Sequence, residues 1–385
     1  MLIMKQVLTP RRTVAHLSSV HDAFDIRIFH KECHSLAQAG YEVTVIAPHG
    51  RSEIVDGIKV EGVPPAHYRL LRITDTTRKV WWRAFCLQAD LYHFHDPELI
   101  PAGLLLRACG KKVIYDVHED VPRDLLAKEY LPAWQRQPLA RLFEAMEDFV
   151  SRFFSALITV TPGIAKRFQH QPRTVLVRNF PRLEEFTPAL TATWSDRLPA
   201  VAYVGGIAAD RGIQEMVQAM GMLPGSLPAR LLLATNGFPS LLRHKAALEH
   251  GWDRVEHRGH LDHEGVLHLL RQVRGGLVCF HPVPNNVTAL PHKLFEYMAA
   301  GIPVIASDFP TWREIVVKHQ CGLLVNPMDP RAIAIAIEYL LTHPQEAELM
   351  GQRGRHAVEE HYNWTAEEQA LLGLYGRLLE PTCVA

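Results

Sequence analysis

Short runs of β-branched and apolar residues alternate with stretches of helical periodicity along most of this chain. In the first half, these runs predict strands at Thr13–Leu17, Tyr41–Ala47, Ile58–Val63, Leu91–His95, Lys112–Val117, Ala156–Thr161 and Thr174–Arg178. In the second half, they predict strands at Val201–Val204, Ala229–Ala234, Val255–Arg258, Gly276–Phe280, Pro303–Ala306 and Gly322–Val325. Strands separated by helices pair in parallel, because the helix carries the chain back across the sheet. The sequence therefore predicts an α/β fold of two tandem Rossmann-like, doubly wound domains facing a central cleft.

The alternation is interrupted once, between the two halves. Residues 183–198 have no sustained period and are typical of an interdomain linker. We therefore expect a first domain over residues 1–183, a linker over 184–198 and a second domain over 199–365. With 385 residues in the chain, each half is long enough to bury a core of its own.

The composition excludes several classes of protein. The 41 Lys and Arg residues balance 41 Asp and Glu residues, so no global field draws the chain to nucleic acid. No apolar run approaches the roughly 18 residues of a membrane-spanning helix, and the start, from Met1 to Lys5, lacks the longer apolar stretch of a secretory signal. The 6 cysteines form no C-x-x-C pair, which argues against a zinc site and a disulfide framework. We expect a cytoplasmic protein with reduced cysteines.

The segment Pro291–Ser307 combines a short helix with a buried strand. Pro291 suits the first turn of the helix and Gly301 suits its C-terminal stop. The helix N-terminus would offer free N–H groups and a positive dipole end, both of which suit a phosphate. Glu296 lies inside this helix, where its carboxylate can accept two hydrogen bonds from a vicinal diol such as a nucleotide ribose. The alternative for Glu296 is a capping or salt-bridging role.

The string from Lys293 to Ile305, KLFEYMAAGIPVI, resembles the donor-site segment of family 4 glycosyltransferases. Weaker similarities follow in order along the chain, at His21-Asp22, Asp25-x-Arg27, Tyr115-Asp116-x-His118-Glu119, Asn179-x-Pro181, Val204-Gly205-Gly206, Arg211-Gly212 and Tyr362-Asn363-Trp364. The resemblance implies the GT-B fold and a retaining transfer from a sugar nucleotide without a metal. It also implies that the C-terminal helix, residues 366–385, packs back on the first domain.

The chain departs from the family pattern at Thr288. Many members place two glutamates eight positions apart, and the first of them would fall on Thr288 here. In the resembling enzymes that glutamate contacts the donor sugar near the reacting carbon. A subset of the family instead has a Pro-x-Lys-x-Phe-Glu string, which Pro291–Glu296 matches. We interpret the departure as a subfamily variation.

A glycine turn follows the predicted strand at 201–204. Gly205 and Gly206 would let the backbone approach a diphosphate, although without a third glycine they form no dinucleotide fingerprint. Arg211 and Lys293 would supply cations that offset the charge on a departing nucleotide, so both are candidate catalytic residues. The alternative for each is a solvated surface position. These four residues, with Leu294 and Glu296, form the expected nucleotide-binding set.

In the first domain, polar residues gather where predicted strands end, at Ser18, Ser19, His95, Asp96, His118, Glu119, Thr161 and Asn179. Such positions face the ligand crevice of a doubly wound sheet. His118 is the leading candidate catalytic residue, because the resembling enzymes use a histidine at this point to contact the donor sugar. A histidine satisfied by local backbone is the alternative.

The string His93-x-His95-Asp96, with Glu98, raises the question of a metal. Alternate residues of a strand share a face, so His93 and His95 could converge. No other ligand cluster has recognisable spacing, and the resembling fold does its chemistry without a metal. We expect no metal, and we assign His16 and the remaining histidines to surface or packing positions.

Residues Arg78–Phe85 combine two tryptophans with three cations. Aromatic and basic residues on one helix face suit an anionic membrane interface, which would give peripheral contact with the inner membrane face. Packing of Trp81 and Trp82 against the first sheet is the favoured alternative.

The resemblance, taken with these features, implies a retaining glycosyltransferase of hexosyltransferase type. It would move a sugar from a nucleoside-diphosphate sugar, with UDP or GDP favoured, to a hydroxyl of a saccharide or lipid-linked acceptor in polysaccharide or glycolipid assembly. No cofactor and no protein nucleophile are expected. A sugar-nucleotide epimerase of the same fold would instead release a changed donor without an acceptor, and a non-catalytic nucleotide-sugar-binding protein would bind without turnover. An NAD enzyme is disfavoured, because neither domain has G-x-G-x-x-G after a strand.

Overall fold

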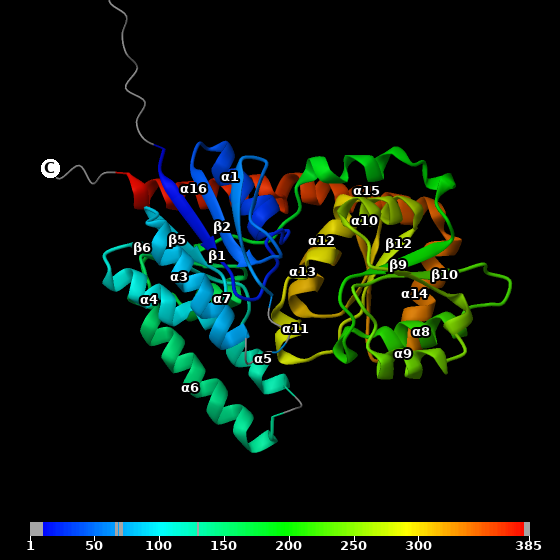
Figure 1. The fold of residues 1–385 in the computed structure, drawn as a ribbon. Helices are drawn as coiled ribbons and strands as arrows, with labels where there is room; N and C mark the ends of the chain where they lie inside the picture. The colour runs from blue at the N-terminus through cyan, green and yellow to red at the C-terminus, as the bar shows by residue number, and fades with distance from the viewer. Residues whose placement is uncertain (1–10, 66–67, 69–71, 129–130, 381–385) are drawn as a thin grey trace, which may run out of the picture. The chain divides into compact units, whose positions relative to one another are not determined.

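The computed structural model describes residues 11–65, 68, 72–128 and 131–380. Residues 1–5, examined above for a secretory signal, and residues 381–385 of the expected C-terminal segment lie outside the described residues. The chain is divided into two compact units. The first runs to Asn179 and resumes at Thr365, and the second spans Phe180–Trp364. Each has a sheet of mainly parallel strands with helices on both faces, which is the architecture that the alternation of strands and helices predicts (Figure 1).

The first unit contains an eight-stranded sheet in the order β3-β4-β2-β1-β5-β6-β7-β8. Its strands are β1 Thr13–Leu17, β2 Glu42–Pro48, β3 Glu53–Val55, β4 Ile58–Val63, β5 Leu91–Phe94, β6 Lys112–Val117, β7 Ala156–Thr159 and β8 Thr174–Leu176. All neighbours pair in parallel except β3 and β4. The central strands are buried from end to end, as expected for a sheet with helices on both faces.

Helices cover both faces of this sheet. They are the π-helical turns η1 Ile28–Cys33 and η2 Arg72–Thr76, the 3-10 turn η3 Pro97–Leu99, and the α-helices α1 His34–Gln38, α3 Thr77–Leu87, α4 Ile100–Ala108, α5 Val121–Ala127, α6 Ala133–Ser151, α7 Pro162–Arg167 and α16 Trp364–Leu379. Leu17 and Phe94 pack in one apolar core with α3 and α4. Their neighbours His16 and His93 point to the opposite face, where they meet Tyr375 of α16. The C-terminal helix is therefore part of the first unit.

The second unit contains a six-stranded parallel sheet in the order β11-β10-β9-β12-β13-β14. Its strands are β9 Ala200–Val204, β10 Arg230–Ala234, β11 Val255–Gly259, β12 Gly275–Val278, β13 Val304–Ser307 and β14 Gly322–Val325. Its helices are α8 Ile213–Met222, α9 Ser240–Ala247, α10 His263–Gln272, α11 Pro284–Thr288, α12 His292–Ala299, α13 Pro310–His319, α14 Pro330–Thr342 and α15 Pro344–His361, with 3-10 turns at η4 Leu183–Thr191, η5 Trp194–Asp196, η6 Ala209–Arg211 and η7 Trp252–Arg254. One continuous apolar core joins the sheet to these helices.

The segment expected as a linker, residues 184–198, packs into the second unit. Phe186, Ala189 and Trp194 are buried in its core. Arg197 is also buried, and it donates hydrogen bonds to the carbonyl oxygens of Leu270, Val273 and Ala189. The boundary between the units lies instead at Asn179–Phe180, with the return at Trp364–Thr365. An absence of period hid this packing, because 3-10 turns place their apolar residues without a helical or strand repeat.

The two tryptophans of helix α3 differ in exposure to solvent. Val80 and Ala84 are buried, and Trp81 packs partly against the core of the first unit. Trp82 is 57% exposed. The packing alternative therefore describes Trp81 but not Trp82. Among the described residues, the helices are all too short or too polar to cross a membrane.

Candidate active site

The turn after β9 brings the backbone of Gly205 against a lysine. Gly205 has φ +118°, a conformation that side-chain-bearing residues rarely adopt. Its N–H donates to the carbonyl of Ala234 (2.9 Å), and the Tyr203 hydroxyl donates to the carbonyl of Gly206 (2.6 Å), which fixes the turn. A Cβ on Gly205 would lie 3.1 Å from Lys293 Nζ. Glycine here thus leaves the space that the lysine occupies.

Two cations meet at this turn around the ring of Phe280. Lys293 Nζ lies 3.8 Å from the ring centroid of Tyr203 and 5.1 Å from that of Phe280. The guanidinium carbon of Arg211 lies 4.3 Å from the centroid of Phe280, and Arg211 Nη1 donates to Asn286 Oδ1 (3.4 Å). Burial and the nearby Arg211 charge lower the pKa of Lys293 to about 7. Two cations held together on aromatic faces form a site suited to an anion with more than one negative charge.

Helix α12 presents Lys293 and Glu296 on one face. The helix begins at His292, directly after Pro291, so Lys293 lies in its first turn near the free N–H groups. Glu296 follows three residues later and is partly exposed on the same side. Leu294, by contrast, is fully buried in the core, and its N–H already donates to the carbonyl of Pro291. Of the predicted set, Gly205, Gly206, Arg211 and Lys293 gather around the turn, whereas the Leu294 side chain points into the core.

Thr288 ends the short helix α11 on the surface of the second unit. It is exposed, and its hydroxyl donates to the carbonyl of Pro284 (3.4 Å) in its own helix. The neighbouring Asn286 is buried and connects Arg211 to Asp210, because its amide donates to Asp210 Oδ2 (3.0 Å). The position that carries a glutamate in many family members is thus occupied here by an exposed hydroxyl beside the Arg211 network.

In the first unit, polar side chains gather where β1, β5 and β6 end, as the sequence predicts. Asp96 follows β5 and accepts hydrogen bonds from the hydroxyl of Ser18 (2.8 Å) and from the N–H of Ser19 (2.6 Å), both just after β1. His118 follows β6. Its Nε2 lies 2.8 Å from Asp116 Oδ2 and 3.0 Å from His95 Nδ1. The contact with Asp116 means that His118 is held by a buried carboxylate, not by local backbone.

A buried arginine ties this carboxylate to a second one. Arg27 donates to Asp116 Oδ2 from Nε (3.3 Å) and Nη2 (3.0 Å), to the carbonyl of Val177 from Nη1 (2.9 Å), and its Nη2 lies 3.0 Å from Glu32 Oε1. Burial alone would raise the pKa of Asp116, but Arg27 and His118 outweigh it and hold that pKa well below its usual range. Burial, reinforced by Asp116, raises the pKa of Glu32. The cluster therefore holds one firmly ionised carboxylate and one that resists ionisation.

The histidines behind this carboxylate pair are fully buried. His16 Nδ1 lies 2.9 Å from His95 Nε2, and the Tyr375 hydroxyl lies 2.8 Å from His93 Nδ1 and 3.1 Å from His16 Nε2. Burial lowers the pKa of His16, His93 and His95, which keeps the three rings neutral. His16, assigned above to a surface or packing position, is thus a member of a polar network.

The expected convergence of His93 and His95 is present, and it includes ligands that spacing did not reveal. Donor atoms of His16, Glu32, His93 and His95 lie within 4.8 Å of one another, as do those of His95, Asp116 and His118. Asp96, expected beside them, instead binds the serines after β1. Most ring nitrogens pair with each other, with Tyr375 or with Asp116. His93 Nε2 and both carboxylate oxygens of Glu32 are buried without a hydrogen-bond partner among the described residues.

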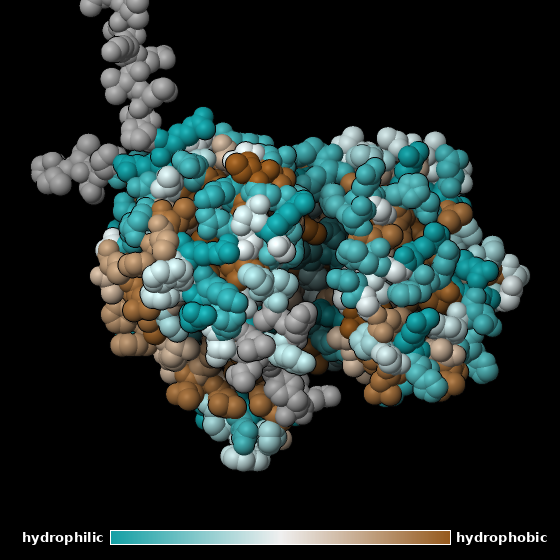
Figure 2. All heavy atoms as spheres, viewed as in Figure 1, coloured by the Kyte–Doolittle hydropathy of each residue, from teal (hydrophilic) through white to brown (hydrophobic). Residues whose placement is uncertain are grey.

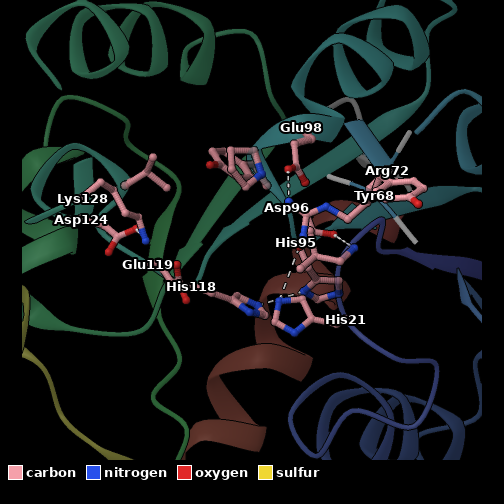
Figure 3. A pocket seen from close by; sticks show the side chains of 14 residues that line it. His21, Tyr68, Arg72, His95, Asp96, Glu98, His118, Glu119, Asp124 and Lys128 are labelled. Atoms are coloured by element: carbon pink, nitrogen blue, oxygen red, sulfur yellow. Dashed lines mark hydrogen bonds and ion pairs between the residues drawn. The ribbon is translucent and has the colours of Figure 1, made fainter. Parts of the chain in front are cut away.

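His118 lines a pocket of about 580 Å³ in the first unit (Figure 3). His21, Asp96, Glu98 and Glu119 line it with His118, and Arg72, Asp124 and Lys128 extend its polar wall. Figure 3 shows His21, His95 and His118 close together at one side of the pocket, with Asp124 and Lys128 at the other. Such a wall of alternating acids and bases suits a ligand with many hydroxyl groups.

Sequence reasoning missed several residues of both sites. In the second unit these are Tyr203, Phe280 and Asn286, and in the first Glu32 and Tyr375. Tyr203 could have been predicted from the sequence, because it lies two positions before the glycine turn and is therefore close to it along the chain. Tyr375 contacts His16, a residue 359 positions away, and no local pattern indicates such a pair.

Comparison with known proteins identifies the class and then the family. A model described as "Glycosyl transferases group 1" matches residues 192–357, and one described as "Glycosyltransferase Family 4" matches residues 27–180. Solved structures of glycosyltransferases superimpose over nearly the whole chain, so the two Rossmann-like units define a GT-B fold. The two models together match most of the chain. The protein belongs to glycosyltransferase family 4.

Individual relatives are distant. Glycogen synthase of Mycobacterium tuberculosis is 25% identical over 255 residues, which are 63% of this chain and 59% of that protein. D-rhamnosyltransferase WbpZ of Pseudomonas aeruginosa is 26% identical over 285 residues, 70% of this chain and 69% of that one. Sucrose-phosphate synthase from Thermosynechococcus elongatus superimposes with a TM-score of 0.74 at 22% identity, over 96% of this chain and 99% of that one. The structure of Anabaena Alr3699/HepE in complex with UDP-glucose superimposes with a TM-score of 0.69 at 13% sequence identity. The match covers 95% of this chain and 99% of that one. At these identities the structures support the fold alone.

Proposed function

We propose that this protein is a retaining glycosyltransferase that moves a sugar from a nucleoside-diphosphate sugar to an acceptor hydroxyl. The observation that carries the proposal is the meeting of Lys293, Arg211 and the Gly205 turn in the second unit. A diphosphate bound there would contact two cations and the first turn of α12, while Glu296 on the same helix face would accept hydrogen bonds from the ribose. A relative whose printed name is a rhamnosyltransferase supports the same class of reaction.

The proposed chemistry requires no protein nucleophile. The bond between the sugar's anomeric carbon and the diphosphate oxygen breaks, and the acceptor oxygen bonds to that carbon on the same face. The acceptor's proton passes to the departing diphosphate. Lys293 and Arg211 stabilise the negative charge that grows on the diphosphate, and His118 contacts the transferring sugar.

The direct test of this proposal has two parts. Thermal unfolding is measured with UDP-, GDP-, ADP- and dTDP-sugars, because a specific donor raises the unfolding temperature by mass action. We expect the largest shift with a UDP- or GDP-sugar. Proton NMR of the product then reports the anomeric configuration, and an inverted product would overturn the retaining mechanism.

The exposed Thr288 favours one alternative, a protein that binds the nucleotide sugar without transferring it. The two functions differ in turnover alone. Donor binding with neither transfer to any of a broad acceptor panel nor slow donor hydrolysis would favour the binding protein.

Glu296→Gln is expected to weaken donor binding about tenfold or more while leaving the fold intact. A hydrogen bond to a charged group contributes about 1.5–3 kcal/mol, and the amide keeps the shape of the side chain but loses the charge. Titration calorimetry with UDP and GDP measures the change. Glu314→Gln, on the exposed surface of α13, is the matched control and should bind as the wild type does. Equal affinity of the Glu296 variant would remove this residue from the ribose role.

Turnover is expected to persist in excess EDTA. The cations proposed to stabilise the diphosphate are the side chains of Lys293 and Arg211, so the proposed chemistry needs no metal at the donor site. Activity that is lost on chelation and restored by a divalent ion would contradict this expectation. Metal analysis of the purified protein then distinguishes an ion bound with the donor from one bound in the histidine cluster.

A further inference from the structure

An apolar groove lies between η2, α5 and α6 in the first unit. It measures about 660 Å³ and is lined only by apolar side chains, namely Ile73, Leu125, Leu131, Leu139, Leu142, Phe143 and Met146. Leu142 is 68% exposed and Leu139 is 40% exposed. Figure 2 shows apolar residues gathered over the position of α6. Apolar side chains left accessible along a groove of this size indicate a binding site more often than a defect of packing.

The groove adjoins the polar pocket that contains His118. Arg72 lines the pocket and the next residue, Ile73, lines the groove. On α5, Val121 and Asp124 line the pocket and Leu125 lines the groove, and Lys128, which directly follows the helix, also lines the pocket. At about 100° per residue, Leu125 lies only about 40° around the helix from Val121, so both face the same side. Pocket and groove are therefore neighbouring parts of one surface, with a polar end and an apolar end.

The two ends differ sharply in chemistry. The pocket is lined by carboxylates, cations and histidines, including Glu98, Arg72 and His118. The groove offers no charged side chain among its lining residues. A free sugar would satisfy the pocket but would leave the groove exposed to water. A ligand with a polyhydroxyl head and a hydrocarbon chain would fill both.

We propose that the acceptor is an amphiphile, whose polar head lies in the His118 pocket and whose hydrocarbon chain lies in the α5–α6 groove. This inference rests on the proposed function, because it assigns the acceptor of that same transfer. The occupant of the groove is a single chain of the acceptor, and the continuity of the groove with the pocket is what favours it over a second protein.

The test uses alkyl glucosides of increasing chain length below the concentration at which they form micelles. Each methylene group buried in the groove should raise affinity about fourfold, so octyl β-D-glucoside should bind at least a hundredfold more tightly than methyl β-D-glucoside. Leu142→Glu places a charge at the groove and should lower the affinity for octyl glucoside at least tenfold. Leu105→Glu, at a 51% exposed position of α4 outside the groove, is the matched control and should leave it unchanged.

Several results would overturn the inference. They are equal binding of methyl and octyl glucoside, binding of octyl glucoside that Leu142→Glu does not change, and a dimer that Leu142→Glu dissociates. Binding to phosphatidylcholine vesicles without binding of monomeric octyl glucoside would also overturn it, in favour of a membrane-surface contact. UDP and GDP affinities measured on the same samples separate the two proposals. Loss of chain binding in Leu142→Glu without any nucleotide binding would support the groove site and overturn the transferase.

Discussion

Arg27→Met is expected to lower the unfolding free energy of the first unit by about 3–5 kcal/mol, the cost of breaking a buried charge pair from one side. Methionine fills a similar unbranched volume, so the loss is mainly electrostatic. The substitution leaves Asp116 without its two guanidinium hydrogen bonds, and it removes the guanidinium nitrogen that lies 3.0 Å from Glu32 Oε1. The hydrogen bond to the carbonyl of Val177 is lost as well. An effect of this size is a large part of the stability of an ordinary domain.

Hydrogen exchange resolved by peptide is the suitable measurement, since the two units need not unfold together. Peptides from β1 and β6 should exchange much faster in Arg27→Met, and those from β9 and β13 should serve as the internal control. Unchanged exchange in β1 and β6 of Arg27→Met would show that the arginine does not hold this cluster together.

Glu32→Gln should be tolerated. Because burial raises the pKa of Glu32, the folded protein holds that proton to a higher pH than the unfolded chain. Stability therefore falls as pH rises above the ordinary glutamate pKa of about 4.3, and Glu32→Gln should remove that fall.

The overall architecture could be predicted because parallel strands are buried on both faces and appear as continuous apolar runs. All seven strands predicted in the first half are present, several with ends shifted by one or two residues. The missed strand is β3, which pairs antiparallel with β4 through a turn at Asp56-Gly57, both with positive φ. The Asp-Gly pair is a strong hairpin signal, but the flanking strand is only three residues long and lies at the edge of the sheet.

The ends of the helices were harder to predict from the sequence than the strands. Apolar residues at helical spacing predict one helix over Arg27–Ala39. The structure has a π-helical turn followed by one short α-helix, which hydrophobic spacing does not distinguish from a single helix. The sequence also predicts a helix over Pro138–Phe154, whereas α6 begins five residues earlier, at Ala133. Because Pro138 is still in the second turn, it removes only one hydrogen bond near the helix end.

The two sites differed in how well the sequence predicted them. Lys293 and Glu296 lie on one short helix, so their spacing alone places them on a common face. The cluster around Asp116 draws Arg27, Glu32 and Tyr375 from segments that the sheet order brings together. Each of these residues has an ordinary local sequence. The register of β1 against β5 pairs His16 with His93, and Tyr375 contacts both rings from a helix far along the chain.

Lys293→Met is expected to lower turnover by about 10²-fold or more, because removing one group that stabilises transition-state charge typically costs that much. The fold should persist, since the methionine still packs over the rings of Tyr203 and Phe280 that the lysine covers. Steady-state kinetics with the donor identified by thermal shift measures the loss. The affinity for UDP or GDP should fall less than turnover does, because Arg211 remains at the site. A variant with full turnover would show that Arg211 and the α12 N-terminus suffice to stabilise the leaving group.

The lowered pKa of Lys293 should make the affinity for nucleotide fall as pH rises. Burial and Arg211 lower the pKa of Lys293 to about 7, so in the free protein the ammonium is lost as pH rises above that value. Phosphate groups are fully ionised above their pKa of about 6, so the nucleotide adds no change of its own there. Affinity for UDP or GDP should therefore fall about tenfold between pH 7 and pH 9. Stability of the free second unit should move the opposite way, because the unfolded chain binds the lysine proton up to about pH 10.4 and the folded state does not. Lys293→Arg keeps its charge at every accessible pH, so its affinity should be flat across the range; a slope that survives in this variant would assign the titration to another group.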